Sequence, residues 1–122
     1  MKILIEAGPV KAEAELADTP TARAVYSSLP WQSEAMTWGD EIYFEIPVRQ
    51  SLDHTASELV SAGDLGYWPT GRAFCIFFGP TPISGPGEIR PASAVNIIGR
   101  ISGSSQIFKQ IKDGAMIRLT VS

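Results

Sequence analysis

The amino-acid sequence predicts a mainly β domain in which short strands form a closed sheet and two helices cap it. Nine prolines and eleven glycines punctuate the 122 residues, and they fall between short apolar runs, as in proteins of many strands joined by turns. Several runs alternate apolar and polar residues with the period of two that half-buried strands have. Helical spacing occurs in two short segments. An antiparallel barrel fits this order, because closure leaves no sheet edge exposed.

The first thirty residues predict a hairpin followed by a helix. Strands are expected at 2–6 and 10–16, because Gly8-Pro9 turns the chain and the second run alternates cleanly. Asp18-Thr19-Pro20 indicates a helix start, since a side-chain oxygen caps free backbone N–H groups and proline needs no N–H there. The apolar stripe of this helix ends before Pro30 and consists of Ala22, Val25, Tyr26 and Leu29.

The middle of the chain predicts three strands separated by polar segments. Residues 31–38 show no clear pattern, and residues 49–62 are polar with room for one helical turn. Pro47 indicates an edge strand or a strand end, because proline cannot donate to the ladder. The last of the three strands is apolar on both faces, which is typical of the centre of a closed or sandwiched sheet. The three strands are expected at 41–48, 65–68 and 73–78.

The remaining residues predict a long loop rich in proline and glycine, a strand, a short helix and a final strand. The helix carries lysines near its C-terminus, where cations are favoured. The final strand again alternates with period two. These elements are expected at 79–91, 94–101, 104–112 and 115–121.

Composition limits the range of functions. The apolar fraction of 44% suits one domain over 1–122 with one sizeable core. The formal charge of −3 lacks the clustered basic residues that favour nucleic acid or anionic membranes, so neither is an expected partner. Cys75 is the only cysteine, the chain start lacks a signal sequence and no apolar run is long enough to span a membrane. We therefore expect a soluble cytoplasmic protein.

Three separated motifs carry a family resemblance. They are Trp38 to Phe44, Gly63 to Pro69 with Gly71-Arg72-Ala73, and Pro91 to Ile101. In this order they resemble a small prokaryotic family with a cyclophilin-like fold and unknown function, and the resemblance covers nearly the whole chain. It implies a closed eight-stranded β-barrel with a short helix at each end, which agrees with the strands expected from the residues alone.

The resemblance does not imply prolyl isomerase activity, because fold and function are separable. Cyclophilins place an arginine on the strand after the first helix, where this chain has Glu45, and a histidine near the segment 95–100, where this chain has none. Their Gln-Phe-Phe motif appears here only as Ala73-Phe74-Cys75. Isomerisation must lower a barrier of about 18–20 kcal/mol. A carboxylate opposes the electrostatic assistance that an arginine supplies.

Several residues are candidates for binding. Aromatic residues with polar tips often line clefts, although most buried aromatics only pack. Arg72 either binds an anionic group or forms a structural ion pair with Glu45 or Asp64. Asn96 lies in an apolar strand, so we expect it to be buried and hydrogen-bonded, either as a structural group or inside a cleft. The aromatic candidates are Trp38, Tyr43, Tyr67 and Trp68.

No catalytic set or metal site is recognisable. Asp53 and His54 are adjacent but lack a nucleophile at suitable spacing, and Cys75 reads as a small buried hydrophobe. One histidine and one cysteine make no zinc pattern, and the loop at 84–87 lacks the features of a phosphate loop. We therefore expect no catalytic residues, no metal and no cofactor.

Two classes of function follow. The favoured hypothesis is a non-catalytic module that binds a small anionic molecule or a peptide through Arg72, Trp68, Tyr43, Glu45 and Asn96. The alternative is an enzyme: a weak or divergent peptidyl-prolyl cis-trans isomerase, or an activity based on the carboxylate of Glu45. A third hypothesis is an accessory subunit of the kind found in amide-hydrolysing or carboxylating assemblies. A homodimer is expected if Trp31 or the loop at 79–91 exposes apolar surface.

Overall fold

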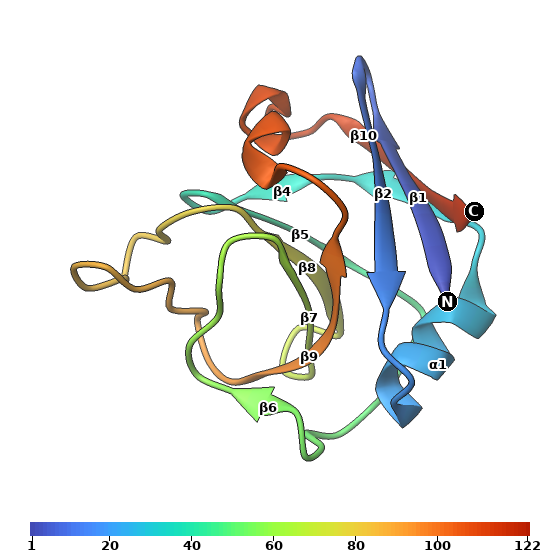
Figure 1. The fold of residues 1–122 in the computed structure, drawn as a ribbon, viewed down its shortest axis with the longest axis horizontal. Coiled ribbons are helices and arrows are strands. Elements are labelled where there is room, and N and C mark those ends of the chain that lie inside the picture. The colour runs from blue at the N-terminus through green and yellow to red at the C-terminus, as the bar shows by residue number, and fades with distance from the viewer.

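A computed structural model describes all 122 residues and contains one antiparallel sheet rolled into a nearly closed barrel (Figure 1). Neighbouring strands follow the order β3-β10-β1-β2-β9-β7-β8-β5-β4, and β6 also pairs with β9. Two of the ten strands, β4 and β6, have two residues each, which leaves eight longer strands. The predicted mainly β barrel with two helices is therefore confirmed. The strands are β1 (Lys2–Ala7), β2 (Val10–Leu16), β3 (Trp31–Glu34), β4 (Met36–Thr37), β5 (Glu41–Glu45), β6 (Ala56–Ser57), β7 (Asp64–Trp68), β8 (Ala73–Phe77), β9 (Val95–Ile101) and β10 (Met116–Val121).

β3 and β4 stand at the two ends of the strand order, and β4 is paired with β5. The barrel therefore has a seam where β3 and β5 lie next to each other without pairing. Only Ala35 separates β3 from β4 along the chain. Its N–H donates to the carbonyl of Ala115 at 2.7 Å, and its carbonyl accepts from the N–H of Gly114 at 2.7 Å. Across the seam, the ring of Trp31 contacts that of Phe44 edge to face, with centroids 5.1 Å apart. Side-chain packing thus replaces a backbone ladder here.

The main core fills the barrel interior. Apolar residues of β2 are buried at every second position, as the alternation predicts. On β5 and β8, Ile42 lies opposite Ile76 and Phe44 lies opposite Phe74, and the two phenyl rings stack with centroids 5.5 Å apart. All four side chains belong to a buried cluster of 25 residues.

The outer face of β8 is also buried. Side chains alternate along a strand, so Ala73, Cys75 and Phe77 point away from the barrel interior, and they pack with Val95 in a second cluster. The chain between β8 and β9 folds back over this face, where Ile89 packs against the cluster. The strand is therefore apolar on both faces as predicted, but a loop rather than another sheet covers its outer face.

Both helices form near their predicted positions. The helix α1 (Pro20–Ser28) is capped by Thr19, whose hydroxyl accepts from the N–H of Ala22 at 3.1 Å. The second helix is a 3₁₀ helix at Ser105–Gln110, capped by the hydroxyl of Ser104. It is shorter and tighter than the segment expected at 104–112.

One expectation on local structure needs correction. No helical turn forms between residues 49 and 62; that segment contains β6 and turns. The carboxylate of Asp53 accepts from both the N–H and the hydroxyl of Thr55, and such local hydrogen bonds compete with a helix. Residues 31–38, for which the sequence shows no clear pattern, contain β3 and β4.

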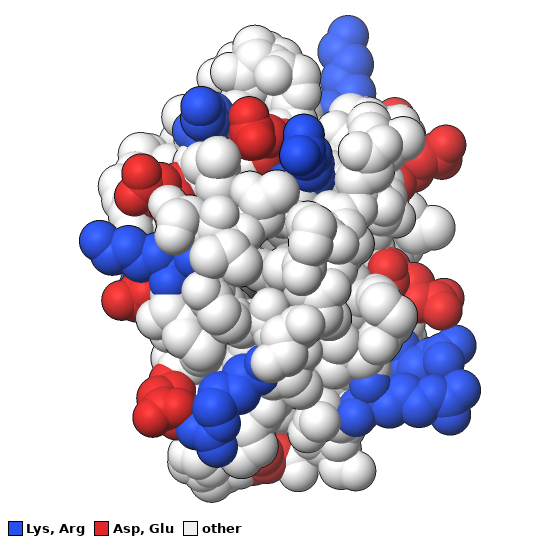
Figure 2. All heavy atoms as spheres, turned by 90° about the vertical axis from the view of Figure 1, so that its right-hand side faces the viewer, with Lys and Arg blue, Asp and Glu red and all other residues white.

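The surface shows charges of both signs. Figure 2 shows acidic and basic side chains interspersed around a largely uncharged centre on the face seen from the right of Figure 1. No helix has the length and apolar character needed to cross a membrane.

Candidate functional site

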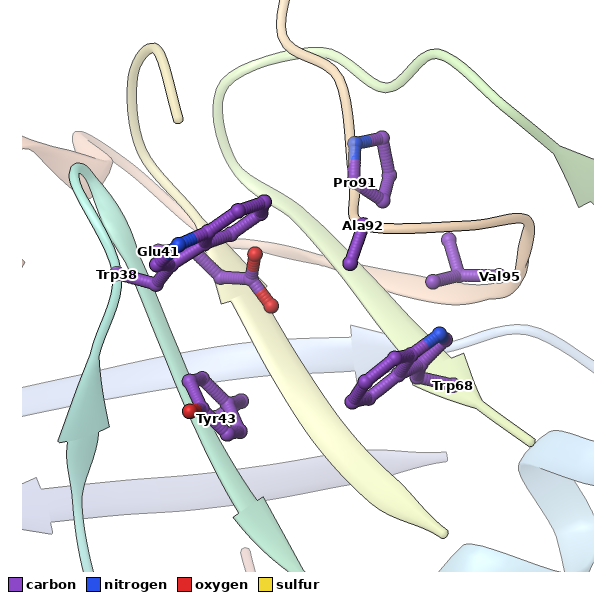
Figure 3. Close-up of a pocket in the computed structure, with 7 residues that line it drawn as sticks. All are labelled: Trp38, Glu41, Tyr43, Trp68, Pro91, Ala92 and Val95. Carbon is purple, nitrogen blue, oxygen red and sulfur yellow. The ribbon is translucent and has the colours of Figure 1, made fainter. Parts of the chain in front are cut away.

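A pocket of about 160 Å³ opens on the outer face of the barrel, over β5, β7 and β8 (Figure 3). Its walls are mostly aromatic or aliphatic, and one carboxyl group points into it. For comparison, an apolar cavity of about 150 Å³ holds benzene. The pocket is lined by Trp38, Glu41, Tyr43, Trp68, Pro91, Ala92 and Val95.

Strand register brings the central aromatic pair together. Tyr43 on β5 lies opposite Cys75 on β8, and Trp68 on β7 lies opposite Ala73 of the same strand. Because Ala73 and Cys75 share the outer face, Tyr43 and Trp68 project on the same side of the sheet. Their rings meet edge to face, with centroids 6.5 Å apart and planes at 85°.

A tight turn positions Trp38 beside Glu41. The N–H of Trp38 donates to the carbonyl of Glu41 at 2.9 Å, and the reverse bond measures 3.2 Å. The turn between them uses Gly39, whose φ of +59° is favoured by glycine. A Cβ at Gly39 would lie 2.8 Å from the carbonyl oxygen of Pro80. The predicted Gly39-Asp40 turn thus anchors one wall of the pocket.

The indole of Trp68 is fixed on two sides. Its Nε1 donates to the hydroxyl of Ser93 at 2.6 Å. On the other side, a Cβ at Gly71 would lie 2.5 Å from the ring. Only glycine at position 71 leaves room for the indole in this place.

Glu41 is the single ionisable carboxyl group in the pocket wall. Its side chain is buried, the residue being 5% exposed, and Oε1 has no hydrogen-bond partner. Burial raises the pKa of Glu41 to about 7, and hydrogen bonding to the nearby Cys75 thiol offsets part of that rise. The thiol also lies 3.9 Å from the carbonyl oxygen of Ala73, to which it donates, and this leaves Oε1 of Glu41 without a partner.

Cys75 lies under the pocket, beside Glu41. It is fully enclosed, and burial, followed by the charge of Glu41, raises the pKa of its thiol well above the usual value. A thiol in this state is a poor nucleophile. Its position agrees with the expected small buried hydrophobe.

Among the predicted site residues, Tyr43 and Trp68 line this pocket, whereas Arg72 and Glu45 do not. Arg72 Nη2 lies 3.2 Å from Glu45 Oε2, in an exposed ion pair at the far end of β5. Of the two roles that the sequence allows for Arg72, the structure shows the ion pair, with Glu45 as the partner. Asp64 instead pairs with Arg100 at 2.6 Å.

Arg72 also borders a separate hollow. This hollow is polar and more open than the aromatic pocket, and Tyr67 reaches it with its buried side chain. Arg72 itself has a φ of +48°, which is uncommon for a residue with a side chain. The hollow is lined by Arg49, Gln50, Ser51, Tyr67, Pro69 and Arg72.

Asn96, on β9, lies outside both the aromatic pocket and this hollow. It is fully buried against the segment that precedes β6. Its Oδ1 accepts from the N–H of Asp53 at 2.8 Å, and its Nδ2 donates to the Thr21 hydroxyl at 3.0 Å and the Ser51 carbonyl at 2.9 Å. Burial alone would raise the pKa of Asp53, but hydrogen bonds from Thr55 and Thr21 outweigh it and lower that pKa. Asn96 therefore ties α1 and a loop to the barrel.

Sequence reasoning missed Glu41 and the contribution of the loop. Glu41 has the period-two relation to Tyr43 that places both on one face, so the signal was present in the sequence. Pro91, Ala92 and Val95 reach the pocket only because the chain after β8 folds back. No three histidine, cysteine, aspartate or glutamate side chains lie close enough together to hold a metal ion.

A family model described as cyclophilin-like matches residues 1–120 of this chain. The chain belongs to this cyclophilin-like family, which confirms the resemblance carried by its three motifs. Among solved structures, it is similar to the solution structure of the hypothetical protein AF2241 from Archaeoglobus fulgidus. The two are 41% identical, the TM-score is 0.84, and the match covers 100% of this chain and 95% of that chain. No curated protein matches.

Proposed function

We propose that this protein is a non-catalytic binding module that takes a small molecule, or one side chain of a peptide, in the outer-face pocket. The observation that carries the proposal is the carboxyl group of Glu41, which has a buried Oε1 without a hydrogen-bond partner and lies among two indoles and a phenol. Most buried polar atoms are hydrogen-bonded, and an unsatisfied one costs about 1–3 kcal/mol. A ligand group that pairs with this carboxyl would recover that free energy.

The pocket suits binding better than catalysis. A carboxyl with a pKa near 7 can transfer protons at neutral pH. Acid–base and nucleophilic mechanisms, however, pair such a group with a second reactive group. The nearest candidate is the Cys75 thiol, which is enclosed and protonated. Glu41 is therefore assigned a role in recognition.

Prolyl isomerase activity receives no support from the pocket. Its walls contain no arginine, and Arg72 is engaged with Glu45 elsewhere. A carboxyl group in place of a guanidinium does not assist rotation about the prolyl bond. We expect no acceleration of cis–trans exchange in a short X-Pro peptide, which takes tens to hundreds of seconds uncatalysed.

The proposal is tested by screening a library of small fragments with the ¹⁵N-labelled protein. We expect binders to shift the indole N–H signals of Trp38 and Trp68 while leaving that of Trp31 in place, because Trp31 lies at the seam. Tyr43→Ala should abolish these shifts. Tyr26→Ala is the matched control, since Tyr26 is also half-buried but lies on α1, outside the pocket.

Two results would contradict the proposal. One is a library that yields no fragment shifting the Trp38 and Trp68 signals. The other is acceleration of prolyl exchange by the wild-type protein that Tyr43→Ala removes, which would restore the isomerase hypothesis.

A further inference from the structure

The charge and shape of the pocket restrict what it can bind. Glu41 projects between the side chains of Trp38, Tyr43 and Trp68, with its oxygens toward the open space (Figure 3). No lysine or arginine lines the pocket, so no cation of the protein neutralises this carboxyl group. A ligand that carries a positive charge would neutralise it.

Resting on the proposed binding function, we propose that the ligand is a small organic ammonium ion, with its alkyl groups against the rings and its charge beside Glu41. Tryptophan and tyrosine faces attract cations within about 6 Å, and tryptophan does so most strongly. A carboxylate strengthens that attraction, because charges interact more strongly at a buried group such as Glu41 than in bulk water. Rings and carboxyl group thus favour the same kind of ligand.

Other ligand charges fit less well. An anion would meet the carboxylate and the negative ring faces. A neutral molecule could pair with Glu41 only by hydrogen bonding, and would gain less from the charge of the carboxylate than a cation does. The cavity volume of about 160 Å³ suits a compact head group such as trimethylammonium better than an extended chain.

The test compares three probes of nearly equal shape: choline, the neutral isostere 3,3-dimethyl-1-butanol, and the anion 3,3-dimethylbutanoate. Binding is followed at pH 8 by the fluorescence of Trp38 and Trp68. We expect choline to bind about tenfold or more tightly than the alcohol, and the anion to bind most weakly. A trimethyllysine amide, with the same head group on a peptide stem, shows whether a free or a peptide-borne cation is preferred.

Glu41→Gln should remove the preference for choline while weak binding of the alcohol remains. Glu45→Gln is the matched control, because it makes the same chemical change on the same strand, at an exposed residue outside the pocket. It should leave the preference intact.

A measurement on the wild-type protein makes the test independent of variant folding. Choline affinity should rise from pH 6 to pH 8 as Glu41 ionises, while affinity for the alcohol should not. The titratable groups facing Glu41 are the Cys75 thiol on β8 and the Tyr43 phenol on β5 itself. The thiol stays protonated over this range because its pKa is raised.

The outcomes separate the two proposals. If the alcohol or the butanoate binds as tightly as choline, the ammonium inference is wrong, but the pocket still binds ligands. If neither these probes nor any library fragment shifts the indole signals of Trp38 and Trp68, the proposed binding function itself fails.

Discussion

Glu41 and Glu45 illustrate how position along one strand separates two identical side chains. They lie on the same face of β5, on either side of Tyr43. Glu45 is exposed and paired with Arg72, whereas Glu41 is buried under the returning loop without a partner. Alternation alone predicts their shared face. Which of the two is buried depends on where a distant segment lands, so local sequence could not reveal it.

Burial of Glu41 makes the stability of the fold depend on pH. The group ionises near pH 7 in the folded state and near 4.5 when exposed. Between these values the folded state keeps a proton that the unfolded chain releases, so stability falls as the pH rises from 4.5 to 7. Below pH 4.5 Glu41 is protonated in both states, and above pH 7 it is ionised in both. Its contribution to the free energy of unfolding is therefore constant in each of these ranges.

Glu41→Gln removes this titration. We expect the free energy of unfolding of the variant, relative to that of the wild type, to rise by about 3 kcal/mol from pH 4 to pH 8. Each unit by which the pKa of Glu41 is raised costs the ionised wild type about 1.36 kcal/mol. Urea unfolding at both pH values measures the difference. Glu45→Gln should show no such gain, and equal pH dependence of wild type and Glu41→Gln would show that Glu41 ionises normally.

Asn96 was predicted to be buried and hydrogen-bonded, and the structure confirms both. Its polar atoms are all occupied by Asp53, Thr21 and Ser51. A single polar residue in an apolar strand predicts burial with partners. The identity of those partners, up to 75 residues away in sequence, could not be predicted.

At the scale of elements, the segment between β8 and β9 determines the site. A proline- and glycine-rich loop was predicted there and is present, yet its return over β8 was not predicted. Hydrogen bonds at its base hold it: the hydroxyl of Ser84 accepts from the N–H groups of Thr81 and Arg90, each at 2.9 Å. These bonds close the loop just before Pro91 and Ala92, which form a pocket wall.

Ser84→Ala should loosen this loop without unfolding the barrel. We expect amide hydrogen exchange at Thr81 and Arg90 to accelerate about thirtyfold, because two hydrogen bonds of roughly 1 kcal/mol each are lost and about 1.36 kcal/mol corresponds to a factor of ten. The urea midpoint should stay nearly constant. Ser102→Ala is the matched control, since Ser102 is exposed and its side chain makes no hydrogen bond. Unchanged exchange at Thr81 and Arg90 would mean that packing alone holds the loop.

The strands themselves were largely predictable. Where alternation is clean, as in β2 and β10, the predicted and observed strands nearly coincide. The strand expected at 41–48 ends at Glu45, close to the proline that indicated an end. β3 and β4 were missed because they are short. Burial alternates along β3, but Trp31 is its only apolar residue, so the sequence shows no hydrophobic alternation there.

At the scale of the whole molecule, the seam is the place where the barrel lacks a continuous hydrogen-bonded ladder. Trp31 closes it by contacting both Phe44 and Phe74, with centroids 5.1 and 5.8 Å away. Its Nε1 donates to the hydroxyl of Ser28 at 3.0 Å, which also links the seam to α1.

Trp31→Ala should therefore destabilise the entire barrel. We expect a loss of about 3 kcal/mol in free energy of unfolding, at the low end for truncating a tryptophan because the side chain is half-buried. Trp31→Phe should lose much less, since a ring remains at the seam. Met116→Ala, at a residue 50% exposed on β10, should have little effect in the same urea titration. A loss below 1 kcal/mol for Trp31→Ala would show that the seam is closed by other contacts.

The close approach of Gly71 to Trp68 has a consequence for relatives of this protein. Any residue larger than glycine at this turn would push the indole out of its place, because even a methyl group would overlap the ring. A homologue that carries alanine or serine there must therefore have a differently shaped recess, whatever its overall identity. This pair of positions can sort family members by the molecules they accommodate before any of their structures is determined.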